Sequence, residues 1–458
     1  MLDKVLDHLR HDHEAAIDRL CDFLRIPSVS TDPAYAEHCL KATDWVVDQL
    51  RACGGEVSIH ETPRHPLVIA HFEGGNPDAP RALFYGHYDV QPPDPLEKWT
   101  TPPFEPTIRD GKLYARGSSD DKGQVMCFIE ALRAWHDIAG KPPVPVTVFI
   151  EGEEECGSVS LDAFIEKHRD LLKADVAVVS DTAMWGPDQP AITYGLRGLL
   201  YFDVKLHGPG RDLHSGVYGG SVPNPCTQLA RVLGKLFNED NAVDIEGFYD
   251  DVAPLTEDER RRWANLNFSD DAWAQSIGLT DGKDLSGEIG FSTLERRWAR
   301  PSCDVCGLYG GYSGEGAKTV IPSFAGAKVS FRLAATQDPN RISDLFRDFL
   351  KANTPAGCRW EIEEFGRARP VVIPIDSPWI AAAQQAVETG CGREAVLNRE
   401  GATIPVVATF KELLGLDTLL IGFGLHDDNL HSPNEKFELN NFRMGCLTHA
   451  SLLAKLAG

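Results

Sequence analysis

The sequence predicts an α/β protein whose largely parallel sheet carries helices on both faces and is interrupted by an inserted α+β domain. Short apolar runs alternate with helical patterns of about 10 to 15 residues, as βαβ units do. At 458 residues the chain exceeds one ordinary core, so two domains are expected. The pattern changes near residues 194–198 and later returns. This divides the chain into a first part (1–196), an inserted domain (197–370) and a second part (371–458).

The elements of the first part follow from hydrophobic periodicity and from the positions of glycine and proline. Apolar residues recur at helical intervals from Leu2 to Leu24 and stop before Pro27, and a second helix ends at Gly54-Gly55. The expected helices span residues 2–24, 36–53, 125–138 and 161–172. The expected strands span residues 57–59, 68–72, 83–85, 144–150 and 175–179.

The inserted domain opens with an alternating apolar and polar pattern over residues 199–206, which predicts a strand. A loop-rich segment that carries several tryptophans occupies residues 243–300. Its other expected elements are helices over 226–237 and 339–351 and strands over 306–309, 327–333 and 359–365. The second part is expected to hold helices over 378–389, 404–414 and 441–456 and a strand over 418–421.

The charge and the cysteine pattern narrow the possible partners and compartments. Sixty-eight acidic and 45 basic residues give a formal net charge of -23, which opposes binding to nucleic acid and to anionic membranes. The N-terminus lacks the apolar core of a signal peptide, and no apolar stretch approaches the ~18 to 20 residues of a membrane span. Eleven cysteines are scattered without framework spacing. We therefore expect a cytoplasmic protein that binds neither nucleic acid nor membranes.

A histidine and an aspartate follow the apolar run Ala82 to Tyr85. In extended backbone His87 and Asp89 project to the same side, so the carboxylate can orient the imidazole. Metal-binding histidines are commonly supported in this way. The alternative is a histidine at a strand end that is simply capped by a nearby aspartate.

Further acidic and histidine side chains stand where other predicted strands end or where a helix begins. They are Glu153-Glu154-Glu155 after 144–150, Asp181 after 175–179, Asp120 before 125–138, and His431 after 418–421. Ligands of open α/β sheets bind beyond the carboxyl ends of the strands. Two histidines with several carboxylates suit two divalent cations that share one carboxylate.

Each of these features also has a simpler explanation. Asp120 and Asp121 could cap a helix and supply an acid to its first turn. The glutamate triplet could be a solvated loop, Asp181 a turn former, and residues 426–431 a polar surface loop. Their coincidence at one sheet edge favours a metal site, because surface composition alone rarely produces it.

Five motifs, in order along nearly the whole chain, resemble those of the dinuclear metallopeptidases. They are Gly86-His-Tyr-Asp-Val-Gln-Pro92, Arg116-Gly-Ser-Ser-Asp-Asp-Lys-Gly123, Glu154-Glu155 before Cys-Gly-Ser158, Ser180-Asp181, and His431-Ser-Pro-Asn-Glu435. That family includes carnosinases, cytosolic non-specific dipeptidases, carboxypeptidases that release glutamate, and acetylornithine or succinyl-diaminopimelate deacylases. The inserted domain resembles the dipeptidase branch most closely.

The resemblance implies a catalytic domain, formed by the first and second parts, that binds two divalent metal ions. Asp120 would bridge the metals, with His87 and Asp181 completing one site and Glu155 and His431 the other. Asp89 would orient His87, and Glu154 would be the general base that activates a water and passes its proton to the leaving nitrogen. One histidine and mixed carboxylates on each ion suit zinc or manganese, and cobalt is possible.

The inserted domain would serve as a lid and dimerisation domain. By the same resemblance, His214 in Asp212-Leu-His-Ser-Gly-Val-Tyr-Gly-Gly220 would stabilise the oxyanion in the partner subunit's site, unless it only caps a helix. Arg332 would hold a substrate carboxylate, or else pair with an acid of the lid. Thr319 and Thr403 would be polar neighbours of the substrate.

Two residues leave the motif assignment open. Glu153 adds a third acid, so the choice of Glu154 and Glu155 rests on counting back from Cys156-Gly157-Ser158. His426 precedes His431 and competes with it as a ligand, and the Asn-Glu that follows His431 favours the latter.

We therefore expect a homodimeric enzyme that cleaves dipeptides or short peptides with a free C-terminal carboxylate. An N-acyl amino acid deacylase with the same metal chemistry is the nearest alternative. A remote one is a protein that keeps the fold and binds amino acids or metal without catalysis.

Overall fold

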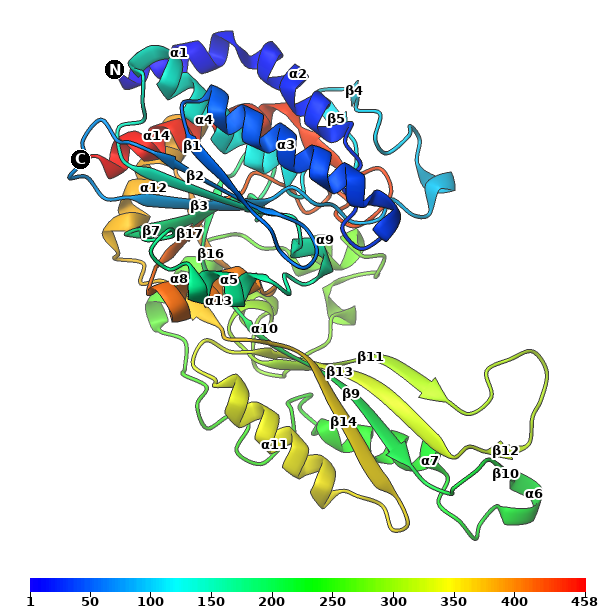
Figure 1. The fold of residues 1–458 in the computed structure, drawn as a ribbon. Coiled ribbons are helices and arrows are strands. Elements are labelled where there is room, and N and C mark those ends of the chain that lie inside the picture. The colour runs from blue at the N-terminus through cyan, green and yellow to red at the C-terminus, as the bar shows by residue number, and fades with distance from the viewer. The chain divides into compact units, whose positions relative to one another are not determined.

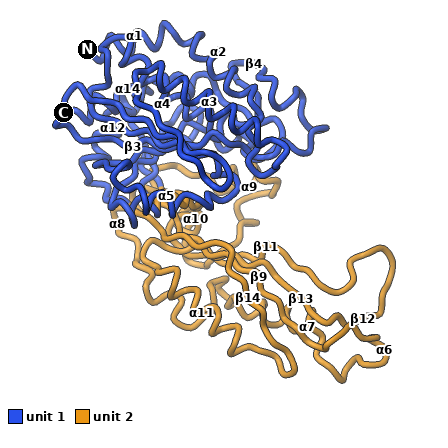
Figure 2. Tube along the Cα trace, viewed as in Figure 1, with its two compact units in different colours: residues 1–194, 373–398, 409–458 blue, residues 195–372, 399–408 orange.

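The computed structural model describes residues 1–458, which form two compact units. Unit 1 comprises residues 1–194, 373–398 and 409–458, and unit 2 comprises residues 195–372 and 399–408 (Figure 2). The short segment 399–408 lies within the part expected to belong wholly to the catalytic domain. The lid and dimerisation roles of unit 2 remain predictions.

The centre of unit 1 is formed by a nine-stranded sheet in the order β1-β2-β6-β3-β7-β17-β8-β15, with β16 paired to β8 (Figure 1). Its strands are β1 (Glu56–His60), β2 (Leu67–Phe72), β3 (Ala82–His87), β6 (Val146–Glu151), β7 (Val176–Val179), β8 (Ala191–Leu196), β15 (Val371–Val372), β16 (Val396–Glu400) and β17 (Thr418–Leu420). Strand β15 and the last residues of β8 and β16 fall within the residue ranges of unit 2. The four central strands β6, β3, β7 and β17 are parallel, and the pairs β1-β2, β2-β6, β17-β8 and β8-β15 are antiparallel.

The helices of unit 1 cover the sheet and are labelled in Figure 1. They are α1 (Leu2–His11), α2 (His13–Leu24), α3 (Ala36–Ala52), α4 (Lys122–Ala139), α5 (Leu161–Lys167), α12 (Pro378–Cys391) and α14 (Leu439–Leu456). The short helix α13 (Pro405–Thr409), which spans the boundary between the units, continues into a π-helical turn over Phe410–Leu414. None of the helices combines the length and hydropathy that a membrane-spanning segment requires.

Strand β3 shows how both faces of the sheet are buried. Phe84 stacks on Phe128 of α4 at 3.8 Å between ring centroids and meets His449 of α14 edge-on. The next residue, Tyr85, points to the other face, where it meets Phe410 edge-on. Neighbouring side chains on a central parallel strand are therefore both apolar or aromatic, which explains its continuous hydrophobic run. The expected α/β fold with helices on both faces is confirmed.

Several elements differ from their predicted bounds. The helix expected over 2–24 is two helices, because the backbone leaves helical geometry at Asp12. The helix expected over 161–172 ends at Lys167, and strand β8 was not predicted at all. The helix expected over 404–414 changes to a π-helical turn that stops at Gly415, whose φ of 73° suits glycine.

Unit 2 is built on a four-stranded antiparallel sheet in the order β11-β13-β9-β14. Its strands are β9 (Gly198–His207), β11 (Ser302–Gly310), β13 (Phe324–Leu333) and β14 (Arg359–Ala368), and β10 (Leu213–His214) pairs with β12 (Val320–Ile321) apart from them. Its helices are α6 (Ser215–Tyr218), α7 (Pro225–Leu233), α8 (Glu257–Ala264), α9 (Asp270–Ser276), α10 (Thr293–Trp298) and α11 (Pro339–Ala352). Phe202 and Phe331 of the sheet pack against Phe346 of α11 in the core.

The parallel register brings the carboxyl ends of three strands of unit 1 to one edge. Ala82 at the start of β3 pairs with Val146 of β6 and Val176 of β7, so the three strands run in step. At the far end His87 stands opposite Glu151, and β7 stops just before Ser180. The loops that leave this edge carry the candidate site.

His449 makes the stability of unit 1 depend on pH. Burial among aromatic rings lowers the pKa of its imidazole from 6.5 to about 3. As the pH falls below 6.5, the unfolded chain takes up a proton that the folded chain does not accept. Above pH 6.5 the neutral His449 does not reduce the free energy of unfolding. As the pH falls from 6.5 toward 3, the free energy of unfolding decreases progressively.

We expect the wild type to lose stability relative to His449→Gln by up to about 1.4 kcal/mol per pH unit as the pH falls below the ordinary histidine pKa. Glutamine can still hydrogen-bond to Ser180, which lies 2.8 Å from His449 Nε2. Urea unfolding of both proteins at about pH 7 and about pH 5 measures the difference. Equal losses in the two proteins would show that this histidine does not set the acid sensitivity.

Candidate metal centre

The candidate site lies at the carboxyl edge of the sheet in unit 1. His87 is the last residue of β3, and Asp181 follows β7 by two positions. Asp120 stands immediately before the segment that opens α4. Gly86 allows this close approach, because a Cβ there would lie 2.5 Å from Val125 Cγ2. The local sequence therefore brings a strand end and a helix start together.

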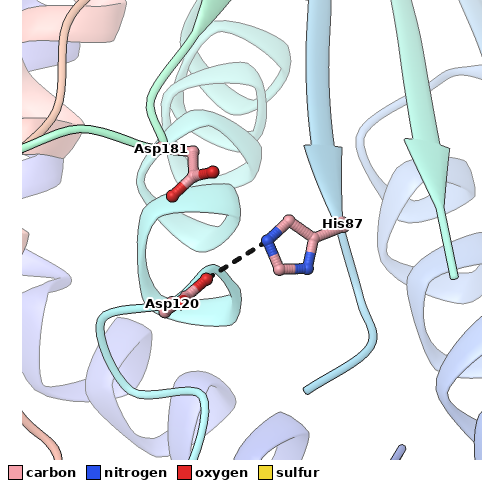
Figure 3. Close-up of side chains that lie close together, drawn as sticks. All are labelled: His87, Asp120 and Asp181. Atoms are coloured by element: carbon pink, nitrogen blue, oxygen red, sulfur yellow. Dashed lines mark ion pairs between the residues drawn. The ribbon is translucent and has the colours of Figure 1, made fainter. Parts of the chain in front are cut away.

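His87, Asp120 and Asp181 form the first group of possible ligands (Figure 3). One ligand atom from each residue lies within 4.8 Å of the others. His87 Nε2 is 3.3 Å from Asp120 Oδ1, and the close-up shows the imidazole turned toward that carboxylate. The three come from segments far apart in the sequence.

Asp120, Glu155 and His431 form the second group, again with ligand atoms within 4.8 Å of one another. His431 Nε2 lies 2.9 Å from Asp120 Oδ2 and 3.5 Å from Glu155 Oε2. His426 belongs to neither group, so the geometry favours His431 as the second histidine.

Asp120 is the residue that the two groups share. Its Oδ1 faces His87 and its Oδ2 faces His431. Burial opposes ionisation of this carboxyl, but the hydrogen-bonded imidazole of His431 and the adjacent imidazole of His87 lower its pKa below the usual range. An ionised carboxylate with each oxygen directed at a different histidine can bridge two cations.

Two supports fix the orientation of the first histidine. His87 Nδ1 lies 3.1 Å from the carbonyl oxygen of Asp89 and 3.4 Å from its Oδ1. The other carboxylate oxygen of Asp89 accepts a hydrogen bond of 3.0 Å from the backbone N–H of Glu155. Asp89 therefore connects a residue of the first group with a residue of the second, and its oxygens offer an acceptor to a proton on His87 Nδ1.

The carboxyl groups of the site crowd one another. Burial, and then the charge of Asp120, raise the pKa of Asp181 to about 7 and that of Glu155 to about 10. His87 Nε2 is buried and forms no hydrogen bond, although Asp120 is near. Desolvated carboxylates with a free imidazole nitrogen are a donor set that divalent cations would satisfy, so the residues fit a two-metal site.

Glu154 belongs to a short 3-10 turn, Glu154–Cys156, that follows β6. Burial raises the pKa of its carboxyl, and the charge of Asp120 adds to the effect. No side chain or backbone group of the protein hydrogen-bonds to this carboxylate. Its carboxylate therefore stays available to a water or a substrate, and unlike Asp181 it belongs to neither group of possible ligands.

Glu153 has a different role that the sequence did not disclose. Its side chain is 1 % exposed, and it accepts hydrogen bonds from Thr62 Oγ1, the His65 amide, and both the amide and the hydroxyl of Ser160. These contacts tie the start of the loop that carries Glu154 to two other segments. Glu153 differs from Glu154 and Glu155 in the number of hydrogen-bond donors around its carboxylate, and this difference appears only in the three-dimensional structure.

Gln91 was also missed as a residue that contacts the site. Its Nε2 donates a hydrogen bond of 2.7 Å to Glu155 Oε2. Gln91 lies inside the Gly86-to-Pro92 motif, which was the available signal.

The remaining predicted residues lie in unit 2. His214 is exposed, and its Nδ1 accepts a 2.9 Å hydrogen bond from the Gly216 amide at the start of α6. The capping contact therefore exists, and it leaves Nε2 unengaged. Thr319 is beside this segment, since its carbonyl accepts from the Ser215 amide at 3.0 Å.

Arg332 and Thr403 are brought together in unit 2. Arg332 Nη1 donates to Thr403 Oγ1 at 2.9 Å, and that hydroxyl donates to the carbonyl of Arg197. Arg332 forms no ion pair with a carboxylate. Burial lowers the pKa of its guanidinium, and nearby Asp304 partly offsets the effect.

Comparison with known proteins identifies relatives over almost the whole chain. The Cys-Gly metallodipeptidase DUG1 of Candida albicans is 35% identical over 455 residues, which cover 94% of this chain and 92% of the relative. The Beta-Ala-His dipeptidase of Homo sapiens is 31% identical over 100% of this chain and 93% of its own length.

Solved structures agree with the sequence comparison. The M20 family metallo-carboxypeptidase Sso-CP2 from Sulfolobus solfataricus superposes with a TM-score of 0.85 at 32% identity, covering 96% of this chain and 99% of that protein. The family described as "Peptidase family M20/M25/M40" matches residues 83–455. The resemblance inferred from the five motifs is confirmed: the chain belongs to peptidase family M20/M25/M40.

Proposed function

We propose that the chain is a two-metal dipeptidase that hydrolyses the peptide bond of dipeptides or short peptides with a free C-terminal carboxylate. The observation that carries the proposal is the shared position of Asp120 between two groups of metal ligands. Relatives similar over nearly their full length are named as a Cys-Gly dipeptidase and a Beta-Ala-His dipeptidase, which supports a dipeptide substrate.

His87, Asp120 and Asp181 would hold one metal ion, and Asp120, Glu155 and His431 would hold the other. Bound divalent cations supply a lowered pKa for water and charge stabilisation at the substrate carbonyl. Each group mixes one imidazole with carboxylates, which supports zinc or manganese and allows cobalt.

Glu154 is the proposed general base. Its carboxylate takes a proton from the attacking water and delivers it to the leaving nitrogen. Its lack of any protein hydrogen bond supports this role, and so does burial, which raises the carboxyl pKa toward the working pH of a base. Asp89 keeps the proton of His87 on Nδ1, so that Nε2 presents its lone pair to the site.

Unit 2 would supply the groups that recognise the substrate. Nδ1 of His214 accepts a hydrogen bond, so the neutral imidazole carries its proton on Nε2, which can donate to an oxyanion. We assign His214 to the site of the partner subunit in a homodimer. Its exposure and the unengaged Nε2 support that assignment.

Arg332 is the proposed anchor for the free carboxylate of the substrate. The side chain is partly buried without an acidic partner, and Thr403 fixes one edge of its guanidinium. A carboxylate would supply the missing counter-charge and accept from the remaining donors. Thr403 and Thr319 would be polar neighbours of the substrate.

A cytoplasmic location is part of the proposal and rests on the scattered cysteines.

An N-acyl amino acid deacylase would use the same metal chemistry, and a binding protein without catalysis would keep the ligands. A panel of dipeptides and N-acyl amino acids, assayed with and without chelator, separates the three. We expect dipeptide hydrolysis that disappears on chelation and returns with Zn²⁺ or Mn²⁺. Turnover of acyl amino acids alone would support the deacylase, and metal binding without hydrolysis would support the binding protein.

Replacing Glu154 with glutamine removes the base and leaves the ligands in place. We expect kcat for dipeptide hydrolysis to fall by about 10²- to 10⁴-fold, the usual contribution of a general base. Metal content, measured by atomic emission spectroscopy, should stay at the wild-type value.

Glu153→Gln is the matched control, because it alters the neighbouring acid of the same loop. Removing a buried acceptor with several donors should lower the free energy of unfolding by about 1 to 3 kcal/mol. The fall in kcat should be far smaller than for Glu154→Gln. If Glu154→Gln kept full activity, or if Glu153→Gln were the inactive variant, the assignment of the base would be wrong.

Arg332→Met should raise KM for a dipeptide with a free carboxylate by at least about tenfold, since a charged hydrogen bond contributes roughly 1.5 to 3 kcal/mol. The same dipeptide with an amidated C-terminus should be a poor substrate of the wild type. The variant should lose this discrimination, which steady-state kinetics on both substrates measures. A variant that still prefers the free carboxylate as strongly as the wild type would exclude Arg332 as the anchor.

A further inference from the structure

Glu435 fills a pocket of hydrogen-bond donors directly behind the metal centre. Its carboxylate is fully buried. Oε1 accepts from the amides of Ser119 at 2.9 Å and Asp120 at 3.1 Å. Oε2 accepts from the Gly117 amide at 2.9 Å and from Arg116 Nη1 at 2.7 Å. Both oxygens are therefore occupied twice, by donors that all belong to one short loop.

That loop holds the shared ligand of the two metal groups. Its amides turn inward around the carboxylate, as in the concave backbone nests that bind anions. Gly117 permits the turn with a φ of 84°, and a Cβ at this position would lie 2.6 Å from Val90 Cγ1. The amide of Asp120 is itself one of the donors, so the backbone of this ligand is fixed by Glu435.

A second buried carboxylate, that of Asp428, also binds the loop that holds Asp120. Like Glu435, it belongs to the segment around His431. Asp428 is fully buried, and its Oδ2 accepts from Ser119 Oγ at 2.9 Å. Its Oδ1 accepts from Lys436 Nζ at 2.7 Å, and the Lys436 amide donates to the Asp428 carbonyl at 3.0 Å. Asp428 and Glu435 thus attach both ends of one loop to the segment around Ser119. His431 lies between these two attachments.

The backbone of His431 needs this support. Its φ is 58°, in the left-handed region that residues other than glycine seldom adopt. Asn429 and Asn434 of the same loop also have positive φ, at 57° and 62°. A loop with three such residues keeps one conformation only when surrounding contacts determine it.

We propose that Glu435 is a positioning residue that fixes Asp120 and His431 relative to each other and thereby sets the affinity for both metal ions. The inference rests on the proposed function, because it assumes that the two ligand groups bind metal. It adds a residue that touches neither metal nor substrate in that scheme.

Glutamine cannot replace Glu435 in this pocket. In either orientation its amide NH₂ would face N–H donors, at Ser119 and Asp120 or at Gly117 and Arg116. The loop would have to move to relieve that contact, and Asp120 would move with it. Loss of an outer partner of this kind typically weakens metal binding by about 10- to 100-fold.

The test compares Glu435→Gln with Glu130→Gln in the full-length protein. Glu130 is also a buried carboxylate with an arginine partner, accepting from Arg19 at 2.8 Å and 2.7 Å, but it lies within α4 and contacts no ligand. Thermal unfolding of the metal-free proteins reports stability. Isothermal titration with Mn²⁺ reports affinity at a temperature where all are folded, and kcat and KM complete the comparison.

We expect both variants to lose stability, while only Glu435→Gln binds Mn²⁺ about 10- to 100-fold more weakly. Its kcat should recover in part at high Mn²⁺, with KM little changed. Unchanged Mn²⁺ affinity in Glu435→Gln, or an equal loss in Glu130→Gln, would overturn the inference. If Glu435→Gln does not fold, Glu435→Asp, which keeps the charge but is one methylene shorter, is judged by the same comparison. A wild type that binds no Mn²⁺ would instead refute the proposed function.

Discussion

The rest of unit 1 is arranged around a desolvated cluster of negative charge at the edge of its sheet. Burial raises the pKa values of Asp181 and Glu155, and the nearby charge of Asp120 opposes the ionisation of both. Such an arrangement is unfavourable by itself. It persists because parallel strands hold the side chains in place. Bound cations could also neutralise the carboxylate charges, for which the protein itself supplies too few positive groups.

The residues behind the ligands follow the same logic. Asp89 joins His87 to the Glu155 amide, Gln91 donates a hydrogen bond to Glu155, and the backbone of the Asp120 loop is held around the carboxylate of Glu435. Each of these hydrogen bonds restricts the movement of a candidate ligand away from the others. A site built from repelling groups therefore needs more support than the ligands themselves provide.

Features that depend on local pattern were predictable from the sequence, and features that depend on distant contacts were not. Strands such as β3 and β6 follow from apolar runs, and the candidate ligands that the structure brings together follow from motifs at the strand ends. The break at Asp12 and strand β8 leave little trace in periodicity. Glu153 and Glu154 are chemically identical neighbours, and only hydrogen bonds to Thr62, His65 and Ser160 distinguish them.

The distance along the chain between the two ligand-bearing loops has a consequence for biosynthesis. His431 and Glu435 contact the loop before α4 across more than three hundred residues, with unit 2 encoded between them. A ribosome that has just completed unit 2 has already synthesised four of the five candidate ligands, and only His431 is still missing. Helix α14, which packs on α4, is made later still. The second group of possible ligands can therefore form only after the segment that carries His431 and Glu435 has been synthesised.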